Sequence, residues 1–507
     1  MEAVPNKIQT QKRIEEKIIE THTEELIIGL CGPIGTDIHY VAEEIKATII
    51  EKFNYDVEII KLSSFIKKIK KFDDRKVKSR FDYHNDLISL GNELRSEKGN
   101  SVLAQLAINE IALKREELKL DHKDAHFTSK RICFIIDSIK NIDELELFRL
   151  VYLNLFYFIG VFSNLELREK NLEKGGLKKD EIFKLIDRDS GEEINNGQKV
   201  ADTFAQADMF LRIDQSTSAK IANKINRFLN LIFNSDVVTP SSNETAMYQA
   251  FAAAGNSACL SRQVGASITN QNGEIISVGW NDVPRFNGSV YKFEETDPLG
   301  EKDFRCINLE GGKCFNDQEK EIIRINLIDQ LVQGGVMKIE DMEKAHSIIK
   351  SSRIKELIEF SRAVHAEMHA IILASQKSGA QILGGKLFCT TFPCHNCARH
   401  IVAAGIREVY YIEPYRKSLA LKLHDDSITE NESNTEKLRI LMFDGISPRR
   451  YLDFFKMAPN SRKESGIKKK WDKKKIYPKK TLSLQAIPIL EKEIIKDLQS
   501  KNLIMIV

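Results

Sequence analysis

Two short motifs, H-A-E beginning at His365 and P-C-H-N-C beginning at Pro393, constrain the fold more than any other feature of this sequence. One imidazole and two thiolates, here those of His365, Cys394 and Cys397, can occupy three corners of a tetrahedral zinc site and leave the fourth for water. The fold must then bring two segments that are distant in sequence to one point. A carboxylate beside the imidazole, that of Glu367, can move protons on and off the water. We therefore predict a Zn²⁺ site in which Glu367 is the catalytic residue.

The alternative to a catalytic site is a closed structural zinc site, or no metal at all. A bare C-x-x-C would leave that alternative open, but here the His-x-Glu motif and the proline before the first cysteine accompany it. An apolar strand-like run at residues 386–390 leads into the second motif, so that each motif is expected at the start of a helix. The combined H-x-E…P-C-x-x-C pattern is the signature of zinc deaminases, which implies hydrolytic removal of an amino group from a cytosine-type base.

The composition limits the class of protein. A chain of 507 residues with 42% hydrophobic and 29% charged residues is expected to form two or three globular domains. A net charge of +3 is too small to indicate a nucleic-acid or membrane partner. The apolar stretch at 150–162 is too short to span a bilayer, and we expect a buried helix that runs into a buried strand. The polar N-terminus resembles no signal peptide, and eight cysteines without a disulfide pattern indicate a reducing, cytoplasmic location.

Alternating apolar and amphipathic segments predict an N-terminal α/β domain with a parallel sheet at residues 26–235, after a polar leader at 1–25. An apolar run at 26–31 ends in glycines and precedes an amphipathic helix at 38–53, and further strands are expected at 57–60 and 131–137. Residues 235–243 have the composition of a linker.

The second domain is predicted at residues 240–460. Its first helix is expected near Glu244, and two apolar segments at 264–269 and 274–279, joined by Asn-Gln-Asn-Gly, predict a hairpin. Another strand is expected at 408–412. A polar stretch at about 285–360 has the character of an insertion.

A glycine-rich turn follows the first predicted strand and opens a helix, which is the setting of a phosphate-binding loop. The candidate nucleotide-binding residues are Gly29, Gly32, Pro33, Ile34, Gly35, Thr36 and Asp37. The lysine and the hydroxyl residue of the G-x-x-x-x-G-K-[ST] pattern are absent, which argues against ordinary phosphoryl transfer. The turn either binds a nucleotide through backbone amides or is a relic whose fold serves assembly.

Two further features leave alternatives open. The basic tail at 461–507, with its lysine run around Trp471, is either a solvated or disordered segment or a contact for nucleic acid or polyphosphate. Cys306 and Cys314 in the insertion are either buried thiols or ligands of a second metal ion.

From Leu260 to Ile412 the chain resembles the deoxycytidylate deaminases, in the segments Arg262-Gln263-Val264-Gly265-Ala266 and Asn281-Asp282-Val283-Pro284 and in the two zinc motifs. The N-terminal domain, the cysteine-bearing insertion and the run Glu413-Pro414-Tyr415-Arg416-Lys417-Ser418 resemble, more narrowly, the bacterial anti-phage dCTP/dCMP deaminases.

This resemblance implies an α/β protein: an N-terminal P-loop kinase-like parallel-sheet domain and a C-terminal cytidine-deaminase-like three-layer α/β/α domain. It implies an enzyme that converts free deoxycytidine nucleotides (dCTP, dCMP) to uracil nucleotides and so depletes the pool that viral DNA synthesis needs. It further implies a contact of Asn281 with the deoxyribose hydroxyl, a regulatory RNA and a homo-oligomer. The glycine-rich turn itself is a candidate site for a second nucleotide at the N-terminal domain. The alternative for Asn281 is a plain turn residue. The alternatives for the protein are a polynucleotide cytosine deaminase and a nucleotide-sensing scaffold with structural zinc.

Overall fold

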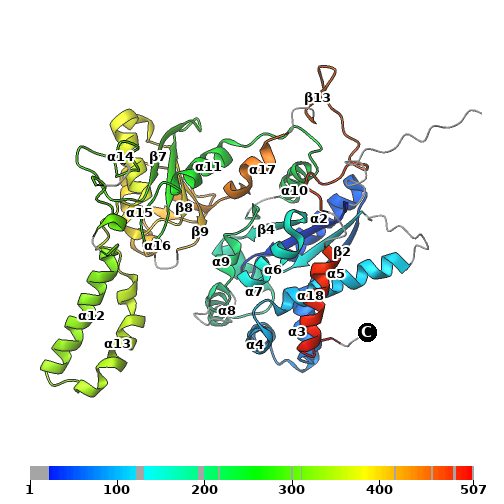
Figure 1. The fold of residues 1–507 in the computed structure, drawn as a ribbon, viewed down its shortest axis with the longest axis horizontal. Helices are drawn as coiled ribbons and strands as arrows, with labels where there is room; N and C mark the ends of the chain where they lie inside the picture. Colours follow the sequence, from blue (N-terminus) through cyan, green and yellow to red (C-terminus); the bar gives the residue numbers. More distant parts are fainter. Residues whose placement is uncertain are drawn as a thin grey trace, which may run out of the picture. The chain divides into compact units, whose positions relative to one another are not determined.

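The computed structural model describes residues 22–120, 131–191, 199–214, 217–297, 301–309, 311–415, 418–457, 461–482 and 487–504. Most of the predicted polar leader, and Arg416 and Lys417 of the run used for the resemblance, lie outside these residues. The chain forms two compact units (Figure 1): unit 1 comprises Met1–Thr239 and Asp444–Val507, and unit 2 comprises Pro240–Phe443. Each described helix is too short or too polar to cross a membrane.

Unit 1 is built on a six-stranded sheet with the strand order β12-β5-β4-β1-β3-β2. The strands are β1 (Leu26–Cys31), β2 (Asp56–Lys61), β3 (Ile132–Asp137), β4 (Phe156–Phe162), β5 (Met209–Arg212) and β12 (Gly445–Ile446). All neighbours pair in parallel except β12, which runs antiparallel to β5. The central strands β1, β3 and β4 are apolar runs that are buried almost throughout, as expected for a sheet covered on both faces. The predicted parallel-sheet α/β domain is confirmed.

The helices of unit 1 connect and cover these strands. They are α2 (Ile38–Phe53), α3 (Leu62–Ile69), α4 (Arg80–Lys98), α5 (Val102–Leu120), α6 (Ile142–Tyr152), α7 (Leu165–Lys174), α8 (Lys179–Gly191), α9 (Val200–Phe204), α10 (Ser218–Ile232), α17 (Tyr451–Phe455) and α18 (Ile487–Ser500). The apolar stretch at 150–162 ends α6 and forms β4, so the expectation of a buried helix that runs into a buried strand is correct.

The C-terminal segment differs from the expectation. The sequence suggested that the second domain extends to residue 460 and that a basic tail follows, but the chain from Asp444 onward belongs to unit 1. Trp471 and Ile476 pack against the hydrophobic core of unit 1, and Lys473 Nζ donates to Asn230 Oδ1 at 2.8 Å. The lysine run suggested a solvated tail because the composition of this segment is dominated by charged residues. Trp471 within the run and Ile476 after it attach the segment to unit 1.

A buried ionic cluster fastens α18 to the rest of unit 1. The guanidinium of Arg115 on α5 donates to both carboxylate oxygens of Glu25 at 2.9 and 2.8 Å, and it also contacts Glu491 of α18. The hydroxyl of Tyr152 donates to Glu491 at 2.9 Å. These side chains are at most 3% exposed. One cation therefore compensates two buried carboxylates that come from opposite ends of the sequence.

Unit 2 has a mixed six-stranded sheet with the order β10-β11-β9-β8-β6-β7. The strands are β6 (Gly265–Thr269), β7 (Ile275–Trp280), β8 (Lys386–Thr391), β9 (Glu408–Glu413), β10 (Ile428–Thr429) and β11 (Leu438–Met442). β6 pairs antiparallel with β7 and β8, whereas β8, β9, β11 and β10 are parallel. The predicted hairpin at 264–279 and the predicted strands at 386–390 and 408–412 are confirmed.

Helices cover both faces of this sheet. α11 (Ser242–Ala254) begins with a capping box between Ser241 and Glu244 and packs on β6. α14 (Ala366–Ser378) packs on β7. A side chain added at Gly265 would meet α11, whereas one added at Gly279 would meet α14. Because Gly265 lies opposite Trp280 and not Gly279, these two glycines face opposite sides of the sheet, which gives the expected α/β/α layers.

The contact at Gly279 supports a prediction about stability. A Cβ atom there would lie 2.5 Å from the backbone nitrogen of Ala370 and 2.7 Å from the carbonyl oxygen of Ala366, so α14 would have to move. We expect Gly279→Ala to lower the free energy of unfolding by about 1–3 kcal/mol in denaturant titrations. Gly379→Ala is the control, because a Cβ atom at that position meets nothing within 4 Å. Equal stability of the two variants would contradict this account.

The predicted insertion forms a helical hairpin that projects from unit 2, as Figure 1 shows. Its long helices are α12 (Phe315–Gln333) and α13 (Met342–Ser351), and short 3₁₀ turns lie at Cys306–Asn308, Ile339–Asp341 and Arg353–Glu356. The remaining helices of unit 2 are α15 (His395–Ala403) and α16 (Ala420–Leu423).

Candidate active site

Three predicted metal ligands meet at the starts of two helices. His365 is the N-cap of α14, and Cys394 is the N-cap of α15, whose first turn contains Cys397. The imidazole Nδ1 of His365 lies 3.4 Å from the Sγ atom of Cys394 and 3.3 Å from that of Cys397. Ideal tetrahedral zinc, with its usual bonds to nitrogen and sulfur, separates these donors by about 3.5 Å. The donor set therefore fits a zinc ion, and it provides three protein ligands, as open catalytic sites do.

The electrostatics of these three side chains also suit a cation. Hydrogen bonds from Cys397 and His365 lower the pKa of the Cys394 thiol to about 4. The same contact with Cys394 raises the pKa of His365 to about 9. One thiolate is thus already favoured before any metal binds. Binding of zinc must release the proton of the imidazole and that of the second thiol.

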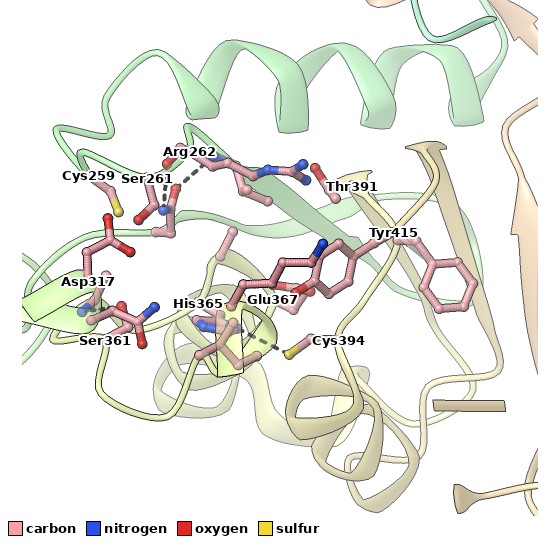
Figure 2. Close-up of a pocket in the computed structure, with 18 of the residues that line it drawn as sticks. Cys259, Ser261, Arg262, Asp317, Ser361, His365, Glu367, Thr391, Cys394 and Tyr415 are labelled. Carbon is pink, nitrogen blue, oxygen red and sulfur yellow. Dashed lines mark hydrogen bonds between the residues drawn. The ribbon is translucent and has the colours of Figure 1, made fainter. Parts of the chain in front are cut away.

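Glu367 lies in the first turn of α14, two residues after His365. Its side chain is 5% exposed, and burial raises its pKa above the usual range of a carboxyl group. Figure 2 shows Glu367 beside His365 and Cys394 in one cavity. A buried carboxyl group with a raised pKa can both accept and return a proton, which general acid–base catalysis requires.

The cavity that contains this cluster has a volume of about 320 Å³. Its lining comes from the segment before β6, the end of the β6–β7 hairpin, the insertion, the two zinc motifs with the end of β8, and the segment after β9. The lining residues include Ser261, Arg262, Asn281, Asn316, Asp317, Lys320, Lys355, Ser361, His365, Glu367, Thr391, Cys394 and Tyr415. In Figure 2 the guanidinium of Arg262 points toward Thr391 and Tyr415, and its Cζ lies 5.7 Å from the Tyr415 ring centroid.

Asn281 also lines the cavity, but its side chain is engaged with the backbone. The Oδ1 atom accepts a hydrogen bond from the amide of Val264 at 2.7 Å, and Nδ2 donates to the carbonyl of Arg262 at 2.8 Å. These bonds hold the segment that precedes β6 against the end of β7. The turn-type role that was the alternative for Asn281 accounts for these two contacts.

The candidate second-metal residues Cys306 and Cys314 lie together with Cys259 around a small second cavity. All three thiols are partly exposed. Among the described residues, only His365, Cys394 and Cys397 bring three potential donor atoms within 4.8 Å of one another. The two cysteines of the insertion are therefore neighbours that do not form a three-ligand cluster.

Side chains of unit 1 form hydrogen bonds with the backbone of the glycine-rich turn. Gly29 lies in β1, and the turn from Gly32 to Asp37 leads into α2, as the sequence predicts. The buried carboxylate of Asp189 on α8 accepts a hydrogen bond from the Ile34 amide at 2.6 Å. Lys140 Nζ donates to Asp189 at 2.9 Å and to the Gly32 carbonyl at 2.8 Å. A side-chain anion and a cation from elsewhere in the sequence thus occupy this turn.

Sequence reasoning missed the wall of the cavity that the insertion supplies. Asn316, Lys320 and Lys355 come from this polar stretch and follow no motif. The helical spacing of the first two was the available signal, because residues four apart share one face of a helix.

The arrangement of an α/β/α unit with one His, two Cys and a Glu at two helix starts defines the zinc deaminase class. A family model described as the cytidine and deoxycytidylate deaminase zinc-binding region matches residues 240–413. The deoxycytidylate deaminase of Enterobacteria phage T4 is 30% identical over 174 residues, which are 34% of this chain and 79% of that protein. This chain belongs to the deoxycytidylate deaminase family.

Two other similar proteins are also named as deaminases. The deoxycytidylate deaminase of Saccharomyces cerevisiae is 23% identical over 332 residues, which are 64% of this chain and 88% of that protein. The dCMP deaminase of cyanophage S-TIM5, solved in complex with dCMP and dUMP, is 21% identical. It covers 41% of this chain and 99% of its own length, with a TM-score of 0.24.

Proposed function

We propose that this protein is a zinc-dependent hydrolase that deaminates free deoxycytidine nucleotides, dCMP and dCTP, to the uracil nucleotide and ammonia. The observation that carries the proposal is the cluster of His365, Cys394 and Cys397 beside the buried Glu367 in a cavity large enough for a nucleotide. Membership of the deoxycytidylate deaminase family supports the choice of base and sugar.

The chain's own residues account for the proton transfers. His365, Cys394 and Cys397 would hold the metal, which when bound lowers the pKa of water and so supplies a nucleophile near neutral pH. The Glu367 carboxylate accepts a proton from the attacking water. It donates this proton to N3 of the cytosine ring, takes up a second proton from the hydroxyl now bound to C4, and passes it to the departing amine. Its burial keeps bulk water from competing for these protons.

The substrate proposal is tested by incubating the purified protein with dCMP, dCTP, cytidine-containing RNA and single-stranded DNA while ammonia release is measured. We expect release from the free nucleotides. Release from the polymers alone would favour a polynucleotide deaminase, and release from none of them would favour a nucleotide-sensing scaffold.

Removal of a zinc ligand is expected to remove both metal and activity. We expect Cys397→Ser to lose its bound zinc, measured by mass spectrometry of the metal, and to lower activity at least about 100-fold. Cys389→Ala is the matched control, because that buried thiol of β8 lies outside the cluster. Full activity of zinc-free Cys397→Ser protein would contradict the proposed chemistry. The zinc content of a Cys306→Ser/Cys314→Ser variant tests the candidate second metal site separately.

We further propose that the enzyme protects bacteria from phage by depleting the cytosine deoxynucleotide pool, and that unit 1 is a P-loop-kinase-like domain.

The assignment of unit 1 as a P-loop-kinase-like domain is supported by the strand–turn–helix unit at Gly29–Asp37, in the centre of a parallel sheet. A nucleotide that used the Ile34 amide would have to displace Asp189, which accepts its hydrogen bond. The proposed defence role is tested by measuring the nucleotide pools of infected cells that express the wild type or Glu367→Ala. A cytosine deoxynucleotide pool that is the same with both proteins would contradict this role.

A further inference from the structure

The insertion contributes a polar wall to the cavity that contains the zinc cluster. Asn316 and Lys320 lie one turn apart near the start of α12, and both line this cavity. Because residues four apart lie on the same face of a helix, α12 presents an amide and an ammonium group side by side. Lys355, from the 3₁₀ turn after α13, lines the same cavity.

Asn316 carries a buried hydrogen-bond acceptor that lacks a partner among the described residues. The residue is 8% exposed, and its Nδ2 donates to the carbonyl of Leu357 at 3.0 Å, which fixes the orientation of the amide. The Oδ1 atom is buried and unpaired. A buried polar atom without a partner costs about 1–3 kcal/mol, so this acceptor is suited to a donor that arrives with a ligand.

Lys320 places a positive charge beside this acceptor. Its side chain is 13% exposed, and Nζ donates to the backbone carbonyl of Lys355 at 3.1 Å. Among the described side chains, the carboxylate within 4 Å of this Nζ is that of Asp317, which is 3.7 Å away and belongs to a side chain that is 72% exposed. Water screens such a carboxylate, so most of the charge of Lys320 is left for an anion in the cavity.

We propose that the insertion recognises the sugar and phosphate of the substrate: Asn316 Oδ1 accepts a hydrogen bond from the 3′-hydroxyl of the deoxyribose, and Lys320 holds the phosphate chain. This inference rests on the proposed function. The exocyclic amine of the cytosine must face the zinc cluster, and the 3′-hydroxyl is then the remaining donor of a deoxycytidine nucleotide. Its phosphate extends from the same sugar. The amide and the ammonium group on one face of α12 match that arrangement.

The sugar contact is tested by comparing dCTP with its 2′,3′-dideoxy analogue in the wild type and in Asn316→Ala. We expect the wild type to prefer dCTP by at least about tenfold in kcat/KM, because a site built for a hydroxyl is left with an unpaired polar group by the analogue. Asn316→Ala should reduce that preference to about twofold or less. An unchanged preference would overturn the role of Asn316.

The phosphate contact is tested with deoxycytidine, dCMP and dCTP as alternative substrates. For Lys320→Gln we expect the kcat/KM of dCTP relative to deoxycytidine to fall at least about tenfold, mainly through KM, with partial recovery in Lys320→Arg. Lys344→Gln on α13, which does not line the cavity, is the control. Parallel losses on all three substrates would overturn the role of Lys320. A wild type that deaminates none of them would contradict the proposed function itself.

Discussion

Glu367→Gln is expected to lower the kcat for dCMP and dCTP by about 10²–10⁴-fold while the protein keeps its zinc. Glutamine preserves the size and the burial of the side chain but cannot take up or release a proton near neutral pH. The metal ligands are unchanged, so zinc content and thermal stability should stay close to those of the wild type. Steady-state kinetics together with metal analysis measure both quantities.

The control for this variant is Glu274→Gln, which changes a carboxyl group of unit 2 that does not line the cavity. It should retain wild-type kcat and zinc content. Activity of Glu367→Gln within a few-fold of the wild type would show that another group moves the protons. Loss of zinc together with activity would mean that Glu367 mainly supports the metal site.

Arg115→Ala is expected to destabilise unit 1 by about 3–5 kcal/mol, although the residue is far from the zinc motifs in sequence. The change leaves Glu25 and Glu491 buried without their cation, and both side chains are 3% exposed. Burial already raises the pKa of Glu491, so this carboxyl group has little solvent to compensate the loss. Denaturant unfolding measures the change in free energy.

The matched control is Arg75→Ala. Its guanidinium pairs with Asp73 at 3.1 Å but is 90% exposed, so we expect a change below about 1 kcal/mol. Adding Glu25→Gln and Glu491→Gln to the Arg115 variant should restore part of the stability, because the uncompensated charges are then gone. A loss of less than about 1 kcal/mol in Arg115→Ala would contradict the importance of the cluster.

Sequence patterns predicted those parts of the molecule whose signals are local. The hairpin at Gly265–Trp280 and the strands before and after the second zinc motif follow from residues a few positions apart. Each of these segments carries its own periodicity or motif. The meeting of His365 with the two cysteines was predicted from the ligand set that a zinc ion requires.

Contacts between distant segments could not be predicted in this way. The pairing of β12 with β5, the Arg115–Glu491 contact and the carboxylate of Asp189 at the Ile34 amide join parts of the chain that no periodicity connects. The sequence does not show whether a charged residue is buried or exposed to solvent. The composition of the lysine run therefore led to the prediction of a basic tail. The wall formed by Asn316 and Lys320 stayed hidden for the same reason, because the insertion has a polar sequence throughout.

The return of the C-terminal segment to unit 1 has a consequence for biosynthesis. Arg212 of β5 and Asp444, which precedes β12, are separated by 232 residues and yet are hydrogen-bonded. A ribosome that adds 5–20 residues per second needs about 10–50 seconds to cover that distance. During this interval all of unit 2 is synthesised, and the edge of β5 stays without its partner strand β12. A nascent chain that stops early would therefore carry a finished deaminase fold attached to a sheet with an open edge.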